Sequence, residues 1–364
     1  MKETKFTADN RAYEAWLRTQ CAVVEKDLAL KHQRMRQDPF RFLRATYFRW
    51  ARRIEAICPE LTDAPAVLAV GDAHLENFGT WRDAEGRLIW GINDFDEAAV
   101  MPYPFDLVRL AASARLAPEL RIANRAIAEA ILLGYRRGLK APRATLLDEH
   151  ERWMRPLVAC SDKERTRFWK ETDNLLSTRP PRTVMRDLRH SLPAGASLVR
   201  FCPRVRGSGS LGRPRYVAIA TCGGGRVVRE AKALVPSAWD WAHDRAAGRS
   251  RFLALARGRF RSPDPHLQVR HGFIIRRIAP DARKVEFTDD AGARVKIDLL
   301  EAMGFDLGAI HAAGGQAAAA VLADLRSRPA GWLAGAAKAA AQAVKADFRA
   351  WRLRHAGKDL MGSE

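Results

Sequence analysis

The sequence is poor in the features that mark disulfide-bonded, zinc-binding or membrane-spanning proteins. Five cysteines stand at positions 21, 58, 160, 202 and 222, and no two of them form a Cys-x-x-Cys pair. An odd count without such pairs argues against a disulfide framework and a zinc site. No run of about 18 apolar residues, as a transmembrane helix requires, is present. Met1 to Asn10 is polar and has no apolar signal core, so we expect a cytoplasmic protein.

Acidic residues are few relative to basic ones. Lys and Arg number 62 against 42 Asp and Glu, a formal net charge of +20. Such a balance favours an anionic partner: a nucleotide, a phosphorylated substrate, a nucleic acid or a membrane surface. Because Arg is spread along the whole chain, a high-Arg composition without a specific partner is the alternative. No zinc finger or aromatic-basic motif indicates specific nucleic-acid recognition, so charge alone predicts only non-specific, salt-sensitive association.

A polar loop directly follows an apolar run that is typical of a buried strand. The run Ala66 to Val70 leads into the turn Gly71-Asp72, and Asn77 and Asp94 follow within a short span. Carboxylate and amide oxygens are the ligands that hard cations prefer. Asp72 stands at the mouth of the loop, where a general base could lie. The spacing Asp-x4-Asn followed by a separate Asp matches phosphoryl transfer, in which the first Asp takes the hydroxyl proton and the other two bind metal.

Three motifs resemble the kinase-like small-molecule phosphotransferases, which include aminoglycoside phosphotransferases and choline kinases. The motifs are similar to the catalytic loop, the metal-binding segment and the Pro-containing segment that opens the next helix. They are Gly71-Asp72-x-His74-x-x-Asn77, Asn93-Asp94-Phe95-Asp96 and Pro102-Tyr103-Pro104-Phe105-Asp106-Leu107. From about Asp38 to about Gly314 the chain most closely resembles a bacterial family, domain of unknown function 2252. A surface turn with scattered acids is the alternative, which three motifs at matching offsets disfavour.

The resemblance assigns a role to each polar residue of these motifs. Asn77 and Asp94 would hold Mg²⁺, and Asp96 would help with a second ion. His74 would order the catalytic loop, because an imidazole can bond the backbone on both sides. Asp106 would brace the backbone of the loop.

A Phe-x-Phe-x-Arg segment precedes the catalytic loop in the resembled bacterial family. Phe40-Arg41-Phe42-Leu43-Arg44 matches it, which implies that Arg44 could reach a phosphate. A surface Arg lying over apolar neighbours is the alternative.

A glycine-rich turn between two expected strands lies far downstream. Ser197 to Arg206 alternates as a strand does and enters Gly207-Ser208-Gly209-Ser210-Leu211-Gly212. Two more strands, Tyr216 to Ala220 and Arg226 to Leu234, are separated by the turn Gly223 to Gly225. A dinucleotide-binding fold would need a helix directly after the glycines. Strand, Gly-rich turn, strand, turn and strand with a Lys is instead the arrangement of a kinase nucleotide lobe.

The glycine-rich turn predicts a nucleotide site. Glycines let backbone amides approach phosphates that a side chain would block. The residues expected to cradle the phosphates are Gly207, Ser208, Gly209, Ser210 and Gly212.

Two basic residues of the third strand are candidates for neutralising the α- and β-phosphates. Lys232 is the first, and Arg229 is its rival, because the family pattern Lys-Glu-Ala could align on Arg229-Glu230-Ala231. Strand alternation puts the two on opposite faces, so only one can point at the nucleotide. Kinases pair the strand Lys with a Glu. No clear equivalent is found, and Glu230, Asp240 and Asp244 are the stand-ins.

The order of the two regions predicts a circular permutation. Leu299 to Ala313 resembles the helix ending in Leu-His that precedes the catalytic loop in aminoglycoside phosphotransferases, yet it lies far downstream of that loop. His311 is expected to be a packed or capping residue. We therefore expect an α+β, protein-kinase-like, two-lobe fold, circularly permuted, with the catalytic segment before the nucleotide lobe. Permutation is tolerated when the original ends lie close together at the surface.

The expected organisation has four parts. They are N-terminal helices (1–60), a helical catalytic lobe (61–190), a β-rich nucleotide lobe (195–285) and C-terminal helices packing on the catalytic lobe (290–364). Further expected elements are helices at Asn10 to Met35, Phe40 to Cys58, Phe105 to Leu116, Pro118 to Leu139, Arg143 to Ala159, Ser161 to Leu176, from Ala238, Ser250 to Arg257 and Ala317 to Gly357, hairpins at Trp81 to Ile92 and Lys284 to Ile297, a strand at Val269 to Ile278 and a linker at Ser177 to Pro193.

These features predict an enzyme that uses ATP and Mg²⁺ to phosphorylate a hydroxyl of an unidentified small molecule or protein. One alternative is nucleotidyl (AMP) transfer with ATP inverted. Another is a non-catalytic pseudokinase or a basic module that associates with nucleic acid.

Overall fold

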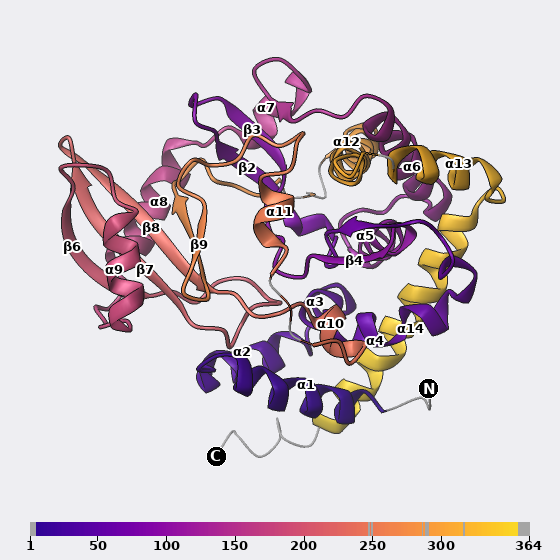
Figure 1. Cartoon of the computed structure of the whole chain (residues 1–364), viewed down its shortest axis with the longest axis horizontal. Coiled ribbons are helices and arrows are strands. Elements are labelled where there is room, and N and C mark those ends of the chain that lie inside the picture. The colour runs from indigo at the N-terminus through magenta and orange to yellow at the C-terminus, as the bar shows by residue number, and fades with distance from the viewer. Residues whose placement is uncertain are drawn as a thin grey trace.

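The computed structural model describes residues 5–246, 248, 250–285, 287, 291–315 and 317–355. Figure 1 shows a β-rich part on one side and a helical part on the other. The β-rich part is an antiparallel five-stranded sheet in the order β6-β7-β8-β10-β9. Its strands are β6 (Ser197–Pro203), β7 (Arg215–Cys222), β8 (Gly225–Ala233), β9 (Gln268–Arg270) and β10 (Phe273–Ile278). The three strands expected around the Gly-rich turn are confirmed, whereas the single strand expected over Val269 to Ile278 is wrong, because this segment turns back at His271-Gly272 and pairs β9 with β10.

The helical part contains two small sheets. In one, β1 (Ala66–Ala69) pairs with β4 (Ala99–Pro102). In the other, the order is β2-β3-β5, with β2 (Phe78–Arg82), β3 (Leu88–Ile92) and β5 (Thr145–Leu146). The expected hairpin is confirmed, because β2 and β3 pair directly from Phe78 with Ile92 to Arg82 with Leu88.

Helices surround these sheets (Figure 1). Their bounds are α1 (Phe6–Gln20), α2 (Glu25–Arg34), α3 (Pro39–Ala45), α4 (Tyr47–Ile57), α5 (Pro104–Leu116), α6 (Asn124–Lys140), α7 (Arg155–Val158), α8 (Asp162–Asp173), α9 (Arg182–His190), α10 (Ala238–Ala242), α11 (Phe252–Ala256), α12 (Ala293–Ala312), α13 (Ala317–Ser327) and α14 (Trp332–His355). Short 3₁₀ helices lie at Pro59–Leu61, Leu75–Asn77 and Arg152–Met154. None of the described helices combines the length and apolarity that crossing a bilayer requires.

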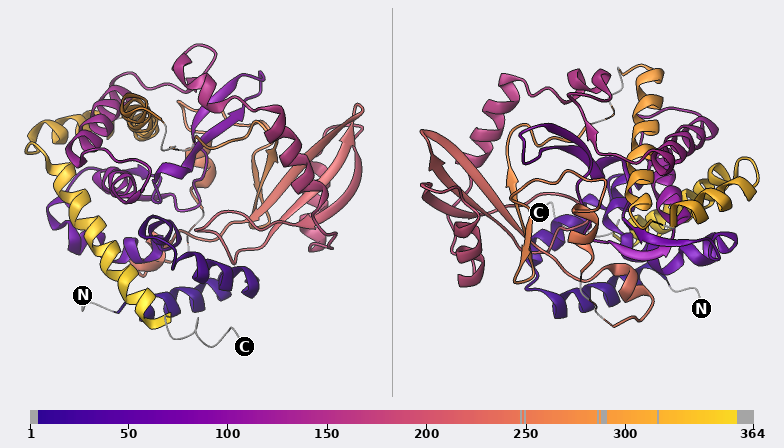
Figure 2. Two further views of the ribbon diagram at one scale, coloured as in Figure 1. Left: turned by 180° about the vertical axis from the view of Figure 1, so that it is seen from behind. Right: turned by 45° about the horizontal axis from the view of Figure 1, so that its top comes forward.

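The C-terminal helix ties the two ends of the helical part together. The helix α14 contacts α5, α3 and α4 along its length. Its C-terminal part lies beside α1 (Figure 2). Phe6 of α1 packs edge-on against Trp351, with ring centroids 5.5 Å apart. The helix α14 therefore packs both on α5 and on the N-terminal helices α1, α3 and α4.

Several expected elements are wrong or shorter than expected. Asn10 to Met35 is two helices, and Phe40 to Cys58 is broken at Thr46. The helix expected over Arg143 to Ala159 is mostly absent, because Thr145 pairs with Trp90 of β3 and tertiary pairing overrides helix propensity.

The linker expected over Ser177 to Pro193 contains a helix. α9 begins after Pro181, and its Val184 and Leu188, spaced four residues apart, are buried. They pack on one face of the five-stranded sheet, in a cluster with Phe201 and Ile275. Because the apolar positions are few and surrounded by charge, the segment reads as polar although one side of it is covered.

The second strand of the hairpin expected over Lys284 to Ile297 is wrong. Ala293 to Ile297 is the first part of α12, and Lys284 forms only an isolated bridge with Gly79. Asp289 and Asp290, in the expected turn, lie outside the described residues. Gly357 at the end of the expected tail helix also lies outside them.

Four glycines bring α6 and α12 unusually close together. They are Gly134 and Gly138 on α6 and Gly304 and Gly308 on α12. A Cβ at any of them would overlap a backbone carbonyl of the other helix. Only glycine permits this approach, so the four-residue spacing on each helix sets the distance at which the pair packs.

Replacing Gly304 by Ala should therefore destabilise the protein. Its new methyl group would meet the carbonyl oxygen of Ile131, which backbone movement alone can relieve. We expect a loss of about 1–3 kcal/mol in the free energy of unfolding, measured by urea denaturation. Gly335→Ala in α14 is the matched control, because its Cβ meets nothing within 4 Å and Ala is the better helix former. Equal stability of the two variants would contradict the close-packing account.

Candidate active site

The two expected regions face each other across one cleft. Its volume is about 1690 Å³, and the described residues lining it include Asp72, Asp94 and Lys232, together with 207–210 of the Gly-rich turn. The loop Gly71 to Asn77, the expected catalytic loop, belongs to the helical part, and the Gly-rich turn belongs to the five-stranded sheet. Segments more than a hundred residues apart in the sequence therefore share one cavity.

The catalytic loop is held by a buried carboxylate. Asp106, which is fully buried, accepts hydrogen bonds from the backbone N–H groups of Val70 (2.7 Å) and Gly71 (2.8 Å). His311 Nε2 lies 3.1 Å from the Asp106 carboxylate, and Tyr135 Oη lies 2.8 Å from His311 Nδ1. The bracing role implied for Asp106 and the packed position expected for His311 both agree with this chain of contacts.

Asp72 is paired with an arginine that sequence reasoning missed. Arg109, fully buried on α5, places Nε 2.6 Å from Asp72 Oδ1 and donates Nη2 to the carbonyl of Leu43 (2.9 Å). Burial raises the pKa of Asp72 to about 6, against the opposing charge of Arg109. The sequence signal was a lone Arg in the otherwise apolar centre of α5, three residues after Asp106.

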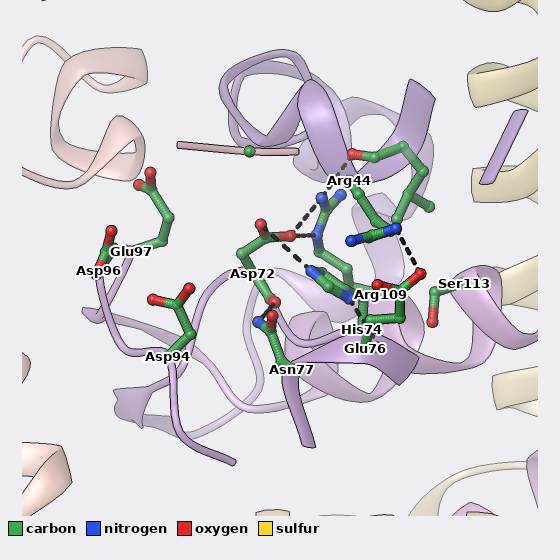
Figure 3. A network of polar contacts seen from close by, with 12 residues as sticks. Arg44, Asp72, His74, Glu76, Asn77, Asp94, Asp96, Glu97, Arg109 and Ser113 are labelled. Atoms are coloured by element: carbon green, nitrogen blue, oxygen red, sulfur yellow. Dashed lines mark hydrogen bonds and ion pairs between the residues drawn. The ribbon is translucent and has the colours of Figure 1, made fainter. Parts of the chain in front are cut away.

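His74 lies beside Asp72 as a neutral side chain. Its Nδ1 accepts the N–H of Glu76 (3.2 Å), and its Nε2 lies 3.9 Å from Asp72 Oδ2 (Figure 3). Burial lowers the pKa of His74 well below its usual range, and the charges of Arg44 and Lys284 lower it further. A neutral imidazole that accepts at Nδ1 carries its proton on Nε2, toward Asp72. This geometry agrees with a loop-ordering role.

The two expected metal-binding segments are joined by their backbones. Asn93 N–H donates to the carbonyl of Asn77 (3.1 Å), so the loop and the Asp94 segment are held side by side. The Nδ2 amide of Asn77 donates to the backbone carbonyl of Asp72. This leaves Oδ1 as the atom of Asn77 that a cation would use.

Asp94 and Asp96 both meet Lys232. Lys232 Nζ lies 3.1 and 3.2 Å from the two oxygens of Asp94 and 2.5 Å from Asp96 Oδ2. Burial would raise the pKa of Asp94, but the Lys232 charge outweighs it and holds that pKa far below its usual range. Burial, together with the charge of Asp94, raises the pKa of Asp96 to about 6. Arg213 Nη1 lies 3.2 Å from Asp96 Oδ2.

The choice between Lys232 and Arg229 follows from the two faces of β8. Lys232 points into the cleft, whereas Arg229 is buried under the other face and donates Nε to the carbonyl of Ser191 (2.9 Å). Of the expected acidic partners, Glu230 binds Arg204, Arg215 and Arg276 instead. Asp240 lies 3.5 Å from Arg251. The acids beside Lys232 come from the opposite lobe.

The Gly-rich turn is held by α2 and by Val24, the residue before this helix. The carbonyls of Gly207, Gly209 and Gly212 accept from Arg34 Nη1 (2.9 Å), Lys31 Nζ (3.2 Å) and Val24 N (2.8 Å), respectively.

One position of the turn, Gly209, lies against the end of α3 and close to Asp72. A Cβ at Gly209 would lie 2.9 Å from the carbonyl oxygen of Arg44 and 3.8 Å from Asp72 Oδ2. Ser208 also lines the cleft, and Ser210 Oγ accepts from Arg215 Nη2 (3.0 Å). The turn therefore approaches Asp72 from the side of the five-stranded sheet.

The donor set fits a cation that also binds phosphate. Among the described residues, no three His, Cys, Asp or Glu side chains gather as metal ligands. Asn77, Asp94 and Asp96 nevertheless bring amide and carboxylate oxygens to one part of the cleft, and Asp96 Oδ1 is buried with no hydrogen-bond partner in the described structure. Mg²⁺ usually takes one or two carboxylates and completes its coordination with phosphate and water.

Comparison with known proteins finds a family match over part of the chain. No curated protein and no solved structure matched the sequence. Residues 23–152, which include Arg44, the catalytic loop, the Asp94 segment and Arg109, match the model of the bacterial family described as "Uncharacterized protein conserved in bacteria (DUF2252)".

Proposed function

We propose that this chain is an ATP- and Mg²⁺-dependent phosphotransferase that moves the γ-phosphate to a hydroxyl group of a small molecule or protein. The observation that carries this function is the contact of Lys232 with Asp94, which are 138 residues apart in the sequence. Lys232, which would bind phosphate, and Asp94, which would bind the metal ion, lie on opposite walls of one cleft. A kinase needs these two groups on either side of the bound triphosphate.

Each residue of the cleft has a defined task in this reaction. The backbone of the Gly-rich turn and Lys232 bind and orient the phosphates. Asp72 accepts the proton of the acceptor hydroxyl, while Arg109 holds its carboxylate in place. His74 orders the loop. When bound, Mg²⁺ at Asn77 and Asp94, with Asp96 beside them, supplies neutralisation of the phosphate charge. Positioning and charge neutralisation carry most of the catalytic effect in this chemistry.

We infer a circularly permuted kinase-like fold from two features. The Gly-rich turn joins β6 to β7 and Lys232 lies on β8, the strand order of a kinase nucleotide lobe. The last turn of α12 carries His311, which contacts Asp106, the carboxylate that binds the backbone at the start of the catalytic loop. The helix α12 also packs on β1. A chain that ran from α12 directly into β1 would have the unpermuted order. We extend the DUF2252 assignment from residues 23–152 to the whole chain on the same grounds. The cytoplasmic location stays a prediction.

Binding of Mg-ATP is the first test. A ligand that binds only the folded protein raises its melting temperature by mass action, so Mg-ATP should stabilise the protein in a thermal-shift assay. Lys232→Gln should weaken ATP binding about tenfold, because one charge-assisted hydrogen bond is worth about 1.5–3 kcal/mol. Lys338→Gln, an exposed lysine of α14, is the matched control.

Product analysis separates the chemical alternatives. Phosphoryl transfer releases ADP, whereas nucleotidyl transfer releases pyrophosphate and leaves AMP on the acceptor. A protein that binds no nucleotide at any Mg²⁺ concentration would rule out the proposed function and leave the non-catalytic basic module.

A further inference from the structure

A second group of cations lies in the cleft, on the other side of Asp72 from the metal-binding acids. Figure 3 shows Asp72 between two groups: Asp94 and Asp96 on one side, Arg44 and Glu76 on the other. Lys284, which also lines the cleft, contacts Glu76. The proposed function assigns the phosphates of the nucleotide to Lys232 and the Gly-rich turn, so it gives no ligand to Lys284 or to Arg44, which the resemblance implied could reach a phosphate. If the hydroxyl of the acceptor faces Asp72, these cations lie on the side where the rest of the acceptor molecule would bind.

Arg44 is built into the wall of the cleft, and Lys284 is an exposed residue beside it. Arg44 is only 8% exposed, and its Nη1 lies 2.5 Å from Glu76 Oε1. Lys284 Nζ lies 3.2 Å from Glu76 Oε2. The Nε atom of Arg44 is buried and has no hydrogen-bond partner in the described structure. Two cations thus share one carboxylate, and a guanidinium donor stays unsatisfied, which is costly in a buried position.

The Glu76 carboxylate occupies the position that a ligand anion would take. It lies between a guanidinium and an ammonium group. Proteins use these same two groups to bind the carboxylates and phosphates of ligands. The cluster of Arg44, Lys284 and Glu76 has a net charge of +1. An incoming anion could share the two cations with Glu76 or displace it.

The cleft as a whole also carries an excess of positive charge. Among the described residues that line it, fifteen are Lys or Arg and eight are Asp or Glu. A cavity lined by an excess of one charge concentrates ligands of the opposite charge. Polycationic acceptors such as aminoglycosides, and quaternary amines such as choline, are poorly matched to this wall.

We propose that the acceptor is a small hydroxyl compound bearing an anionic group, a phosphate or a carboxylate, which Arg44 and Lys284 bind while Asp72 faces the hydroxyl. This substrate class rests on the proposed function. It differs from the cationic substrates that the resemblance to aminoglycoside phosphotransferases and choline kinases would suggest.

Calorimetric titration of simple ions tests the site directly. Inorganic phosphate and succinate represent the two anion sources, and choline is the cationic probe. Each is titrated into the full chain with and without a saturating Mg²⁺ complex of a non-hydrolysable ATP analogue, which covers the nucleotide phosphate site. We expect at least one anion to bind in the presence of the analogue and choline not to bind.

Two variants with opposite effects locate the anion. Lys284→Gln should weaken its binding about tenfold through the loss of one charge-assisted contact. Glu76→Gln should strengthen it, because the competing carboxylate is gone. Lys140→Gln, an exposed lysine at the end of α6 outside the cleft, is the control and should change nothing. A residue with only a structural role would not give opposite signs for Lys284 and Glu76.

The outcomes separate the two proposals. Absence of anion binding, binding of choline in its place, or equal affinity in Lys284→Gln and Lys140→Gln would overturn the anionic acceptor. Failure of the ATP analogue to bind would overturn the proposed function instead, and the titration without nucleotide would still report on the anion site.

Discussion

Replacing Asp72 by Asn is expected to lower turnover by about 10²- to 10⁴-fold, the usual contribution of a general base. The amide is nearly isosteric with the carboxylate but cannot take the proton of the acceptor hydroxyl. Its Oδ1 can still accept from Arg109 Nε, so the loop should keep its geometry. Nucleotide affinity should stay within about twofold, because Asp72 does not contact the phosphates in the phosphoryl-transfer arrangement. Release of ADP under saturating Mg-ATP measures the loss.

The pH profile gives an independent reading of the same residue. Burial raises the pKa of Asp72 to about 6, and the base must be ionised to act. The rate of the wild-type enzyme should therefore rise as pH increases through about 6, and the residual rate of Asp72→Asn should lack this rise. Asp63→Asn, an exposed acid outside the cleft, is the control. Wild-type turnover in Asp72→Asn would refute the base assignment.

Local sequence patterns were sufficient for elements whose neighbours lie close in the chain. Alternation predicted β6, β7 and β8, and the hairpin of β2 and β3 followed from its turn. The polar segment that contains α9 was misread, because its burial depends on a sheet formed by residues that come later in the chain. The break at Thr46 also lacks a local cue such as Gly or Pro.

The candidate site shows the same limit. Asp72, Asn77 and Asp94 could be found by their spacing, since they lie in two short segments. Arg109 stands out in the sequence only as an Arg in the apolar centre of α5, and the folded structure is needed to place it against Asp72.

The positioning of the Asp94 segment was missed for a similar reason. Asp306 of α12 accepts the N–H of Ile92 (2.7 Å) and pairs with Arg261 at 2.7 Å, thereby holding the end of β3 just before Asn93. These two residues are 214 and 169 positions away from Ile92.

The acidic partner of Lys232 is the most instructive error. The kinase pattern predicts this acid in or just after the strand, where Glu230, Asp240 and Asp244 lie. Glu230 is instead fully buried among three arginines. Lys232 meets Asp94 and Asp96 across the cleft, a contact between lobes that no local spacing can reveal.

Asp94→Asn is expected to remove the dependence of ATP binding on Mg²⁺. In the wild-type protein the Asp94 carboxylate is held ionised by Lys232 and is about 40% exposed to the cleft, so it is available to a cation. The amide keeps one oxygen but loses the charge that a divalent ion requires. Turnover should fall at least about a hundredfold, since metal neutralisation is worth several kcal/mol.

The affinity for ATP without metal distinguishes this account from simple damage. Asp94→Asn also removes one of the two acids that compete with phosphate for Lys232, so metal-free ATP should bind Asp94→Asn as tightly as the wild type or more tightly. Titrations of ATP with Mg²⁺ and with a chelator measure both effects, with Asp63→Asn as control. A variant that unfolds would lose both affinities together. If Mg²⁺ strengthens ATP binding equally in Asp94→Asn and the wild type, Asp94 is not a metal ligand, and its contact with Lys232 is only an ion pair between the two walls of the cleft.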